Sequence, residues 1–285
     1  MIFNRTKKFN NYFTKAATPR DIKFLVLHHV QADSADHAVA QFQEHKVSSH
    51  FLIDENGEVF LLVDENDIAY HAGISYWKGF VGLNKNSIGI EFINKSPFEK
   101  RFEHGQLSVG VELCHYLMKK YSIRAQNIIG HSDIAFYPEE HWVRRCFSLR
   151  NIKAIFNCLY KGRDKSPLNL SGFLDRKQDP SHLFDWKFLA QNNIGIFPEI
   201  VLPNGEDKKL FALGDVNLKI KHIKENLAKI GYRVTIFNEE FDVEMQMLAR
   251  VFNRRFNRSI FENDPDSWYL SSLIILEQLM IKLHF

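Results

Sequence analysis

The chain has 285 residues, of which 45% are hydrophobic and 25% are charged, and its formal net charge is +3. A chain of this length and globular composition predicts a main domain with a smaller second one. The charge is too small to argue for a nucleic-acid partner, and no Lys/Arg stripe interleaved with aromatic residues runs through the sequence.

The first predicted element is a strand at residues 22–30, a continuous apolar run rich in β-branched and long aliphatic side chains. His28 and His29 stand at its carboxyl end, which is where open α/β sheets place their chemistry. Successive side chains of a strand point to opposite faces, so we expect at most one of the two histidines to reach a shared site.

Three further elements are predicted before the middle of the chain. Residues 34–46 have helical spacing, and Asn56-Gly57 between two apolar runs predicts a β-hairpin, because both turn positions tolerate positive φ. His71 stands in a predicted loop, where a histidine can line a pocket. Residues 88–93 predict a central strand, and its Glu91 is unusual because a carboxylate in a buried run needs a partner or a function.

The second half is predicted to be mainly helical. Residues 106–121 form an amphipathic pattern that would cover the sheet, and a short apolar segment then ends at His131. Residues 136–174 are interpreted as an inserted helical segment and a candidate lid. Three amphipathic segments within residues 216–283 have short connections and predict a compact three-helix domain.

Five polar residues stand at the ends of predicted elements: His28, Glu91, His131, Lys177 and Asp179. Lys177 and Asp179 come just before a proline that fixes the local backbone. Two histidines and two carboxylates offer nitrogen and oxygen ligands and a proton acceptor, and the lysine adds a cation. This combination is typical of a catalytic zinc site.

Six collinear stretches carry a resemblance to a known family. In order they are residues 26–28 (VLH), 47–53 (VSSHFLI), 71–73 (HAG), 87–91 (SIGIE), 130–135 (GHSDIA) and 176–180 (RKQDP). Together they resemble the type 2 N-acetylmuramoyl-L-alanine amidases, the zinc amidase family that also contains animal peptidoglycan recognition proteins. The resemblance implies an α/β fold with a central mixed β-sheet flanked by helices. It implies a catalytic domain at residues 1–200, with the helical insertion at about 136–174, and residues 210–285 resemble the three-helix peptidoglycan-binding domain of some members.

Carried over residue by residue, the resemblance implies that His28, His131 and Asp179 bind Zn²⁺ and leave a fourth tetrahedral position for water. Zinc would lower the pKa of that water towards about 7. Glu91 would accept the water's proton and deliver it to the leaving amine. Lys177 would stabilise the oxyanion of the tetrahedral intermediate. The implied enzyme is an N-acetylmuramoyl-L-alanine amidase, a zinc hydrolase acting on a linear amide.

The third ligand has alternatives, because the sequence departs from the family at one place. In the family the motifs of His131 and Asp179 are only a few residues apart, whereas residues 136–174 intervene here. Asp133 and His141, both near His131 in sequence, are therefore rivals of Asp179. The spacing within the second motif favours Asp179.

Three other residues have expected roles near the metal. His50, a further rival ligand, is expected to be a buried structural histidine beside the site. His71 is expected to line the substrate pocket. Arg176 is expected to bind a carboxylate of the stem peptide, with a surface role as the alternative.

The implied substrate is peptidoglycan or its fragments, cut between the lactyl group of N-acetylmuramic acid, or its 1,6-anhydro form, and L-alanine. The alternative is a non-catalytic peptidoglycan-recognition protein, although such proteins typically lose a zinc ligand. The N-terminus does not resemble a Sec signal, and no stretch is apolar enough to span a membrane, which favours a cytoplasmic enzyme acting on 1,6-anhydro fragments. The three-helix tail favours intact peptidoglycan and a periplasmic or cell-wall location. Cys114, Cys146 and Cys158 form no C-x-x-C pair, which suggests reduced thiols.

Overall fold

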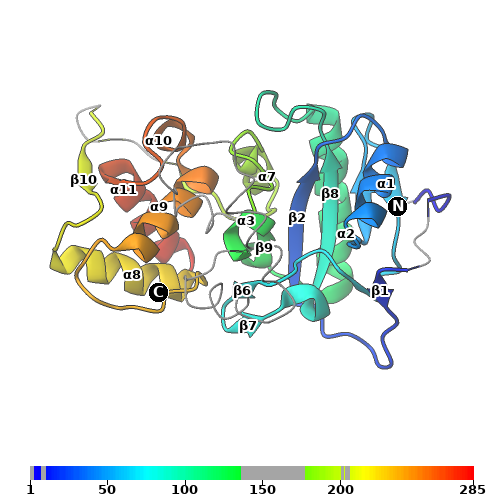
Figure 1. Cartoon of the computed structure of the whole chain (residues 1–285), viewed down its shortest axis with the longest axis horizontal. Helices are drawn as coiled ribbons and strands as arrows, with labels where there is room; N and C mark the ends of the chain where they lie inside the picture. The colour runs from blue at the N-terminus through cyan, green and yellow to red at the C-terminus, as the bar shows by residue number, and fades with distance from the viewer. Residues whose placement is uncertain (1–2, 8–10, 136–176, 200–201, 203–205) are drawn as a thin grey trace, which may run out of the picture.

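The computed structural model describes residues 3–7, 11–135, 177–199, 202 and 206–285. A sheet region and a helical region lie side by side along the longest axis (Figure 1). The predicted helical insertion at residues 136–174, the rival ligand His141 and the substrate contact Arg176 lie outside the described residues.

A five-stranded mixed sheet forms the centre of the first region, as predicted. Its order is β4 (Val59–Leu61), β3 (Phe51–Ile53), β8 (Ser87–Ile93), β2 (Phe24–Val30), β9 (Ile128–Gly130). Every neighbouring pair is parallel except β3 and β4, which form the predicted hairpin. Gly57 in that hairpin has φ of 85°, the conformation for which the Asn-Gly pair is suited.

Two helices cover opposite faces of this sheet. The apolar stripe of α2 (His104–Tyr121), which includes Cys114, packs in one cluster with Phe51. On the other face, Phe42 of α1 (Ala35–Glu44) packs with Leu52, the next residue along β3. Cys114 is fully buried in this cluster, and burial raises the pKa of its thiol to about 12, so it is a core residue.

Short elements complete the first region and lead to the second. Two small antiparallel pairs join β1 (Phe13–Thr14) to β5 (Ile68–Ala69) and β6 (Tyr76–Trp77) to β7 (Phe80–Val81). The short helical segments are η1 (Leu83–Asn86), η2 (Ala125–Asn127), α3 (His131–Ile134) and α7 (Trp186–Gln191). Of these, α3 follows β9 directly and carries the second of the predicted ligand histidines.

The helical region contains more than the three predicted helices. It comprises α8 (Leu218–Ile230), α9 (Val243–Phe256), α10 (Arg258–Asn263) and α11 (Leu270–Lys282), with a small sheet of β10 (Lys209–Phe211) and β11 (Trp268–Tyr269). The six-residue α10 is too short to show a helical period in the sequence. The β10–β11 pair joins segments that are distant in sequence, so no local pattern predicts it.

The helical region shares one hydrophobic cluster with the sheet. Val26 and Ile129 of the sheet lie in the same buried cluster as Phe252 of α9 and Leu279 of α11. The two regions are therefore joined by a common core, and the predicted boundary between residues 200 and 210 stays a prediction.

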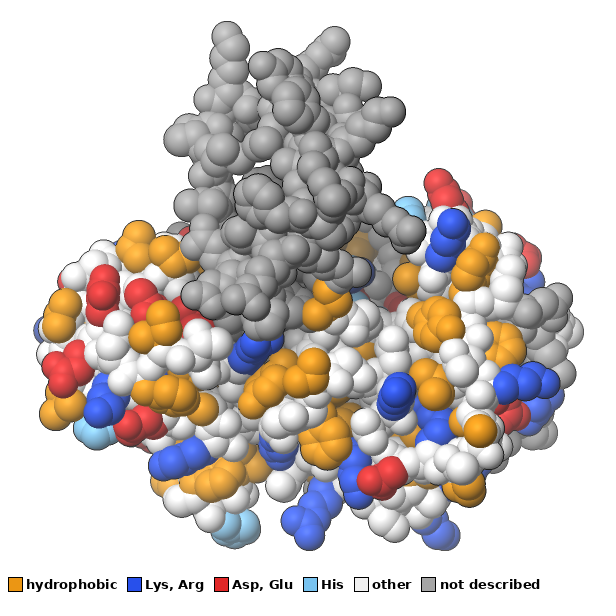
Figure 2. Space-filling view, turned by 60° about the horizontal axis from the view of Figure 1, so that its bottom comes forward, with side chains coloured by type: hydrophobic (Ala, Val, Ile, Leu, Met, Phe, Trp, Pro, Cys, Tyr) orange, Lys and Arg blue, Asp and Glu red, His pale blue; other side chains and the backbone are white. Residues whose placement is uncertain are grey.

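Charged side chains are dispersed over the described part of the surface that Figure 2 shows. On the face in Figure 2, the described Lys and Arg side chains are scattered between apolar and acidic ones rather than joined in a stripe. Among the described residues, no helix combines the length and the hydropathy needed to cross a membrane.

Candidate metal centre and active site

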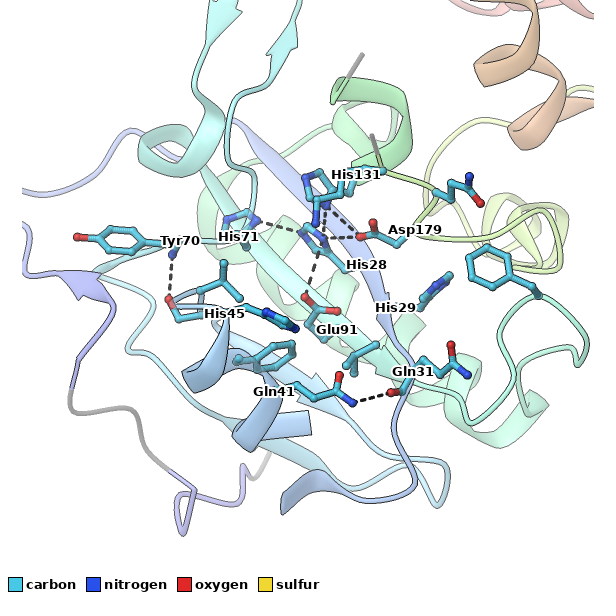
Figure 3. A pocket seen from close by; sticks show the side chains of 17 residues that line it. His28, His29, Gln31, Gln41, His45, Tyr70, His71, Glu91, His131 and Asp179 are labelled. Atoms are coloured by element: carbon cyan, nitrogen blue, oxygen red, sulfur yellow. Dashed lines mark hydrogen bonds and ion pairs between the residues drawn. The ribbon is translucent and has the colours of Figure 1, made fainter. Parts of the chain in front are cut away.

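Three side chains meet at the carboxyl end of β2. His28 ends the apolar run of β2, His131 is the first residue of α3, and Asp179 comes from the stretch after residue 176. The distances His28 Nδ1–His131 Nδ1, His28 Nδ1–Asp179 Oδ2 and His131 Nδ1–Asp179 Oδ2 are 3.1, 3.0 and 3.0 Å. Figure 3 shows the three side chains pointing toward one another.

A chain of hydrogen bonds fixes the tautomer of His28. The hydroxyl of Ser87 donates to the carbonyl of Leu83 (2.7 Å), so its oxygen accepts from His71 Nε2 (3.2 Å). His71 Nδ1 is then an acceptor and receives the Nε2 proton of His28 at 3.1 Å. The proton of His28 therefore sits on Nε2, and its Nδ1 lone pair faces the centre of the site.

His131 is held in the same tautomer. Its Nε2 donates to the backbone carbonyl of Ala72 at 3.2 Å, so its Nδ1 also presents a lone pair. Burial, and then the neighbouring His131, lowers the pKa of His28 to about 4, which keeps His28 neutral at pH 7. His28 is thus in the protonation state that a metal ion requires, and neutral His131 presents its Nδ1 to the same point.

The three atoms form a set of acceptors without a proton between them. Two nitrogen lone pairs and the carboxylate of Asp179 converge on one point, and such groups cannot hydrogen-bond to one another. A cation resolves this, and tetrahedral Zn²⁺ with bonds of about 2.0–2.1 Å places its ligand atoms about 3.3 Å apart, close to the observed separations. The donor set of two histidines and one carboxylate fits catalytic zinc.

Glu91 lies beside this triangle. It is the register partner of His28 on the adjacent parallel strand, and its Oε1 is 4.0 Å from His28 Nδ1. Burial, and then the charge of Asp179, raises the pKa of Glu91 well above its usual value. Its Oε2 is buried and has no hydrogen-bond partner among the described residues. This carboxyl group is therefore placed to accept and release a proton beside the three ligand atoms.

A cavity of about 360 Å³ opens in front of these groups. His28, His131, Asp179 and Glu91 line one side of it. Lys177 also lines the cavity and is exposed, and its backbone carbonyl accepts from Arg254 of α9 at 3.2 Å. The remaining lining residues include His29, Gln31, Gln41, His45, Tyr70 and Phe98.

His28 and His29 were expected to point to opposite faces of the strand, with at most one of them reaching the site. Only His28 is in the metal-ligand cluster, as predicted for one of two strand neighbours. His29 nevertheless lines the same cavity, because its Nδ1 accepts from the backbone of Ser181, and its ring contacts Phe98 edge-on.

The rival ligands have other partners. Asp133 forms an ion pair with Arg255, and its Oδ2 accepts from the backbone of Gly130 at 2.8 Å. His50 is fully buried, and its Nδ1 accepts from the backbone of Gly89 at 3.0 Å. These contacts agree with a structural role for both.

His71 lines the cavity, as expected, but both of its ring nitrogens are engaged with His28 and Ser87. The hydrogen bonds place it as the residue that orients His28, and its contact with a substrate stays a prediction. Sequence reasoning missed this role and that of Ser87. The sequence shows only that Ser87, Gly89 and Glu91 alternate on one strand face. The close approach of His71 to Gly89, where a Cβ would lie 2.5 Å from the imidazole ring, depends on the fold.

Comparison with known proteins agrees with this geometry. A family model described as N-acetylmuramoyl-L-alanine amidase matches residues 18–144. The 1,6-anhydro-N-acetylmuramyl-L-alanine amidase AmpD of Haemophilus influenzae is 32% identical over 144 residues, which cover 44% of this chain and 77% of that protein. This chain belongs to the type 2 N-acetylmuramoyl-L-alanine amidases. It is an enzyme of that activity, and the predicted family and fold are confirmed.

Longer matches extend the similarity of this amidase through the helical region. The N-acetylmuramoyl-L-alanine amidase AmiD of Escherichia coli is 28% identical over 283 residues, which cover 86% of each chain. The solved structure of AmiD in complex with anhydro-N-acetylmuramic acid-L-Ala-D-gamma-Glu-L-Lys has a TM-score of 0.64 at 25% identity and covers 93% of this chain and 91% of its own. AmpDh3 of Pseudomonas aeruginosa, at 22% identity, shares the fold, with a TM-score of 0.65 over 99% of this chain and 100% of its own.

Proposed function

We propose that this amidase is a zinc enzyme that hydrolyses the amide between the lactyl group of N-acetylmuramic acid, or its 1,6-anhydro form, and L-alanine. His28, His131 and Asp179 would hold the metal. The observation that carries the proposal is the convergence of their three unprotonated ligand atoms beside the buried carboxyl of Glu91. Zinc bound there would supply a Lewis acid and lower the pKa of a water molecule.

The chain's own residues account for the proton movements. Glu91 takes the proton of the attacking water and passes it to the leaving amine, for which its raised pKa is suited. The exposed Lys177 brings its ammonium group to the same cavity, where it would stabilise negative charge that develops on the carbonyl oxygen. His71 and Ser87 hold the imidazole of His28 in one tautomer.

The relatives support a 1,6-anhydro substrate. AmiD was solved with an anhydro-N-acetylmuramyl tripeptide, and the AmpD of Haemophilus influenzae is named for 1,6-anhydro substrates. The cavity of about 360 Å³ is open at the surface beside the exposed Lys177, so a soluble fragment can enter it. We therefore infer that soluble anhydromuropeptides are cleaved, as in the turnover of peptidoglycan.

The decisive experiment combines metal analysis with two substrates. The purified protein should contain one zinc per chain, and the zinc-loaded form should release the stem peptide from an anhydromuropeptide and from purified peptidoglycan, as measured by mass spectrometry. Treatment with a chelator should abolish the release, and added zinc should restore it. A zinc-loaded protein that binds either substrate without cleaving it would instead be a recognition protein.

We also propose that the helical region at residues 210–285 holds intact peptidoglycan. In support, apolar side chains are exposed on two loops joined by the hydrogen bond from Asn217 N to Glu239 O: Leu213, Val216, Ile236 and Phe237. Exposed apolar groups in one place mark a contact surface. Phe237→Ser should raise KM for intact peptidoglycan and leave kinetics on a soluble anhydromuropeptide unchanged. If Phe237→Ser has the same kinetic constants as the wild-type protein on intact peptidoglycan as well, this role is refuted.

A further inference from the structure

Two adjacent arginines of α9 reach the two separate stretches that carry the proposed ligands. α9 belongs to the helical region, yet its last turn contacts α3, which starts at His131 (Figure 1). Arg254 and Arg255 are 2% and 8% exposed. Buried arginines need partners, and these two find them beside the metal centre.

Arg255 holds the turn that carries His131. Its Nη1 forms an ion pair with Asp133, and its Nη2 donates to the carbonyl of Ile128 at 3.2 Å. The Arg255 guanidinium also lies over the ring of Trp186, 4.1 Å from its centroid. Because Ile128 and Asp133 lie on either side of His131 in sequence, one guanidinium fixes both ends of the segment that presents this ligand.

Asp133 links Arg255 to the backbone of the segment that carries His131. Its Oδ2 accepts from the backbone N–H of Gly130, one residue before His131, at 2.8 Å. The same carboxylate oxygen is the one paired with Arg255. The side chain of Asp133 is 1% exposed, so without its cation it would be an uncompensated buried charge.

Arg254 holds the second ligand stretch. Its Nη1 donates to the carbonyl of Lys177 at 3.2 Å, two residues before Asp179. The carbonyl of Asp179 in turn accepts from the backbone of Ser132 at 2.7 Å, which links the two stretches to each other. One helix therefore contacts the backbone at both places from which ligands come.

We propose that Arg254 and Arg255 are positioning residues of the metal centre. Through them the helical region supports the two backbone stretches that carry the ligands, on the side away from the cavity. This rests on the proposed zinc function. Neither arginine touches the ligand atoms. They set the distance between His131 and Asp179 by holding neighbouring residues: Arg255 contacts Ile128 and Asp133, and Arg254 contacts Lys177. A helical region that served only to bind a distant part of the polymer would not need these contacts.

The test compares Arg255→Met and Asp133→Asn with a control of similar burial. Asp133→Asn keeps an acceptor for Gly130 and removes the charge, so it remains informative if Arg255→Met does not fold. The control is Lys224→Met, which breaks the ion pair of the fully buried Lys224 with Asp242 (2.7 Å) in the same helical region. Asp242 caps the other end of α9, about 20 Å from Arg255 at 1.5 Å per residue.

Zinc affinity is measured in each full-length protein by competition with a chelator, well below the melting temperature. Both site variants should lose about tenfold in zinc affinity, at the lower end of the range for residues behind metal ligands. They should also exchange backbone hydrogens of residues 128–135 faster, and kcat should fall more than KM rises. Arg255→Lys should recover part of the affinity because it keeps the charge. Lys224→Met should lower the melting temperature with zinc affinity and kcat unchanged.

The outcomes separate this inference from the proposed function. If the wild-type protein binds no zinc, the proposed function fails. If the wild-type protein binds zinc and cleaves substrate, while Arg255→Met and Asp133→Asn lose melting temperature only, as the Lys224 control does, the positioning role is wrong and the zinc function stands.

Discussion

Ser87 offers a test of the hydrogen-bond chain behind His28, because it touches neither the metal ligands nor the cavity. Its hydroxyl is the acceptor for the Nε2 proton of His71 and is itself fully buried. In Ser87→Ala this proton has no acceptor. His71 can then keep an unpaired buried N–H, or move the proton to Nδ1, where it meets the Nε2 proton of His28.

If the proton of His71 moves to Nδ1, His28 loses the Nδ1 lone pair with which it would bind the metal. His28 would have to carry its proton on Nδ1, the atom that faces His131 and Asp179. Binding of zinc would then force His71 back to the unpaired state, which costs about 1–3 kcal/mol for a buried donor. At about 1.4 kcal/mol per factor of ten, zinc affinity should fall by about 5- to 150-fold.

Zinc affinity is again measured by chelator competition, with Ser75→Ala as the matched control. Ser75 is buried near the same loop, and its hydroxyl accepts from the backbone of Leu83 at 3.0 Å, but it is not bonded to a histidine. Ser75→Ala should reduce stability without changing zinc affinity. An affinity of Ser87→Ala within twofold of that of Ser75→Ala would refute the tautomer argument.

Four further predictions follow from the site. His131→Ala should lose most of the bound zinc and nearly all activity, measured by metal analysis and peptide release, and a variant with full zinc and full turnover would overturn the ligand assignment. Glu91→Gln should keep its zinc while kcat falls by about two to four decades, as for loss of a general base. Lys177→Met should keep its zinc and lose about two to three decades of kcat, as for one oxyanion contact; loss of zinc in either variant would mean that catalysts and ligands are confused. Burial lowers the pKa of His29 and of His50 to about 4 and about 3, so the unfolded state binds protons first as pH falls. The free energy of unfolding of the metal-free protein, measured with urea, should therefore fall from about pH 6.5 down to about pH 4, by up to about 1.4 kcal/mol per pH unit for each group. In His29→Gln the same measurement should show a shallower fall.

Elements with a strong local pattern were predictable from the sequence. The buried runs of β2 and β8 have few polar residues, and the Asn56-Gly57 turn dictates its hairpin, so these elements follow from local patterns. Their assembly into a mixed sheet was implied by the family resemblance. The sequence placed His28 and Glu91 on separate buried strands, and their register pairing is seen only in the structure. The metal-ligand cluster among the described residues consists of the three predicted ligands.

Contacts between distant segments were not predictable. Nothing near Arg255 in the sequence indicates that its partner is Asp133, and that pairing depends on how α9 packs on α3. The orienting role of His71 likewise depends on a hydroxyl from a different element, Ser87. Local patterns encode the strands and the ligand types, whereas the hydrogen bonds that set tautomers arise only when the chain is folded.

The hydrogen bond from Ser132 N to Asp179 O has a practical consequence for protein engineering. It clamps the chain where it leaves the site after α3 and where it returns at Lys177, so the spacing of the ligands need not depend on how many residues lie between. A reporter or an affinity domain grafted into this amidase should therefore leave the metal centre intact wherever this hydrogen bond is kept.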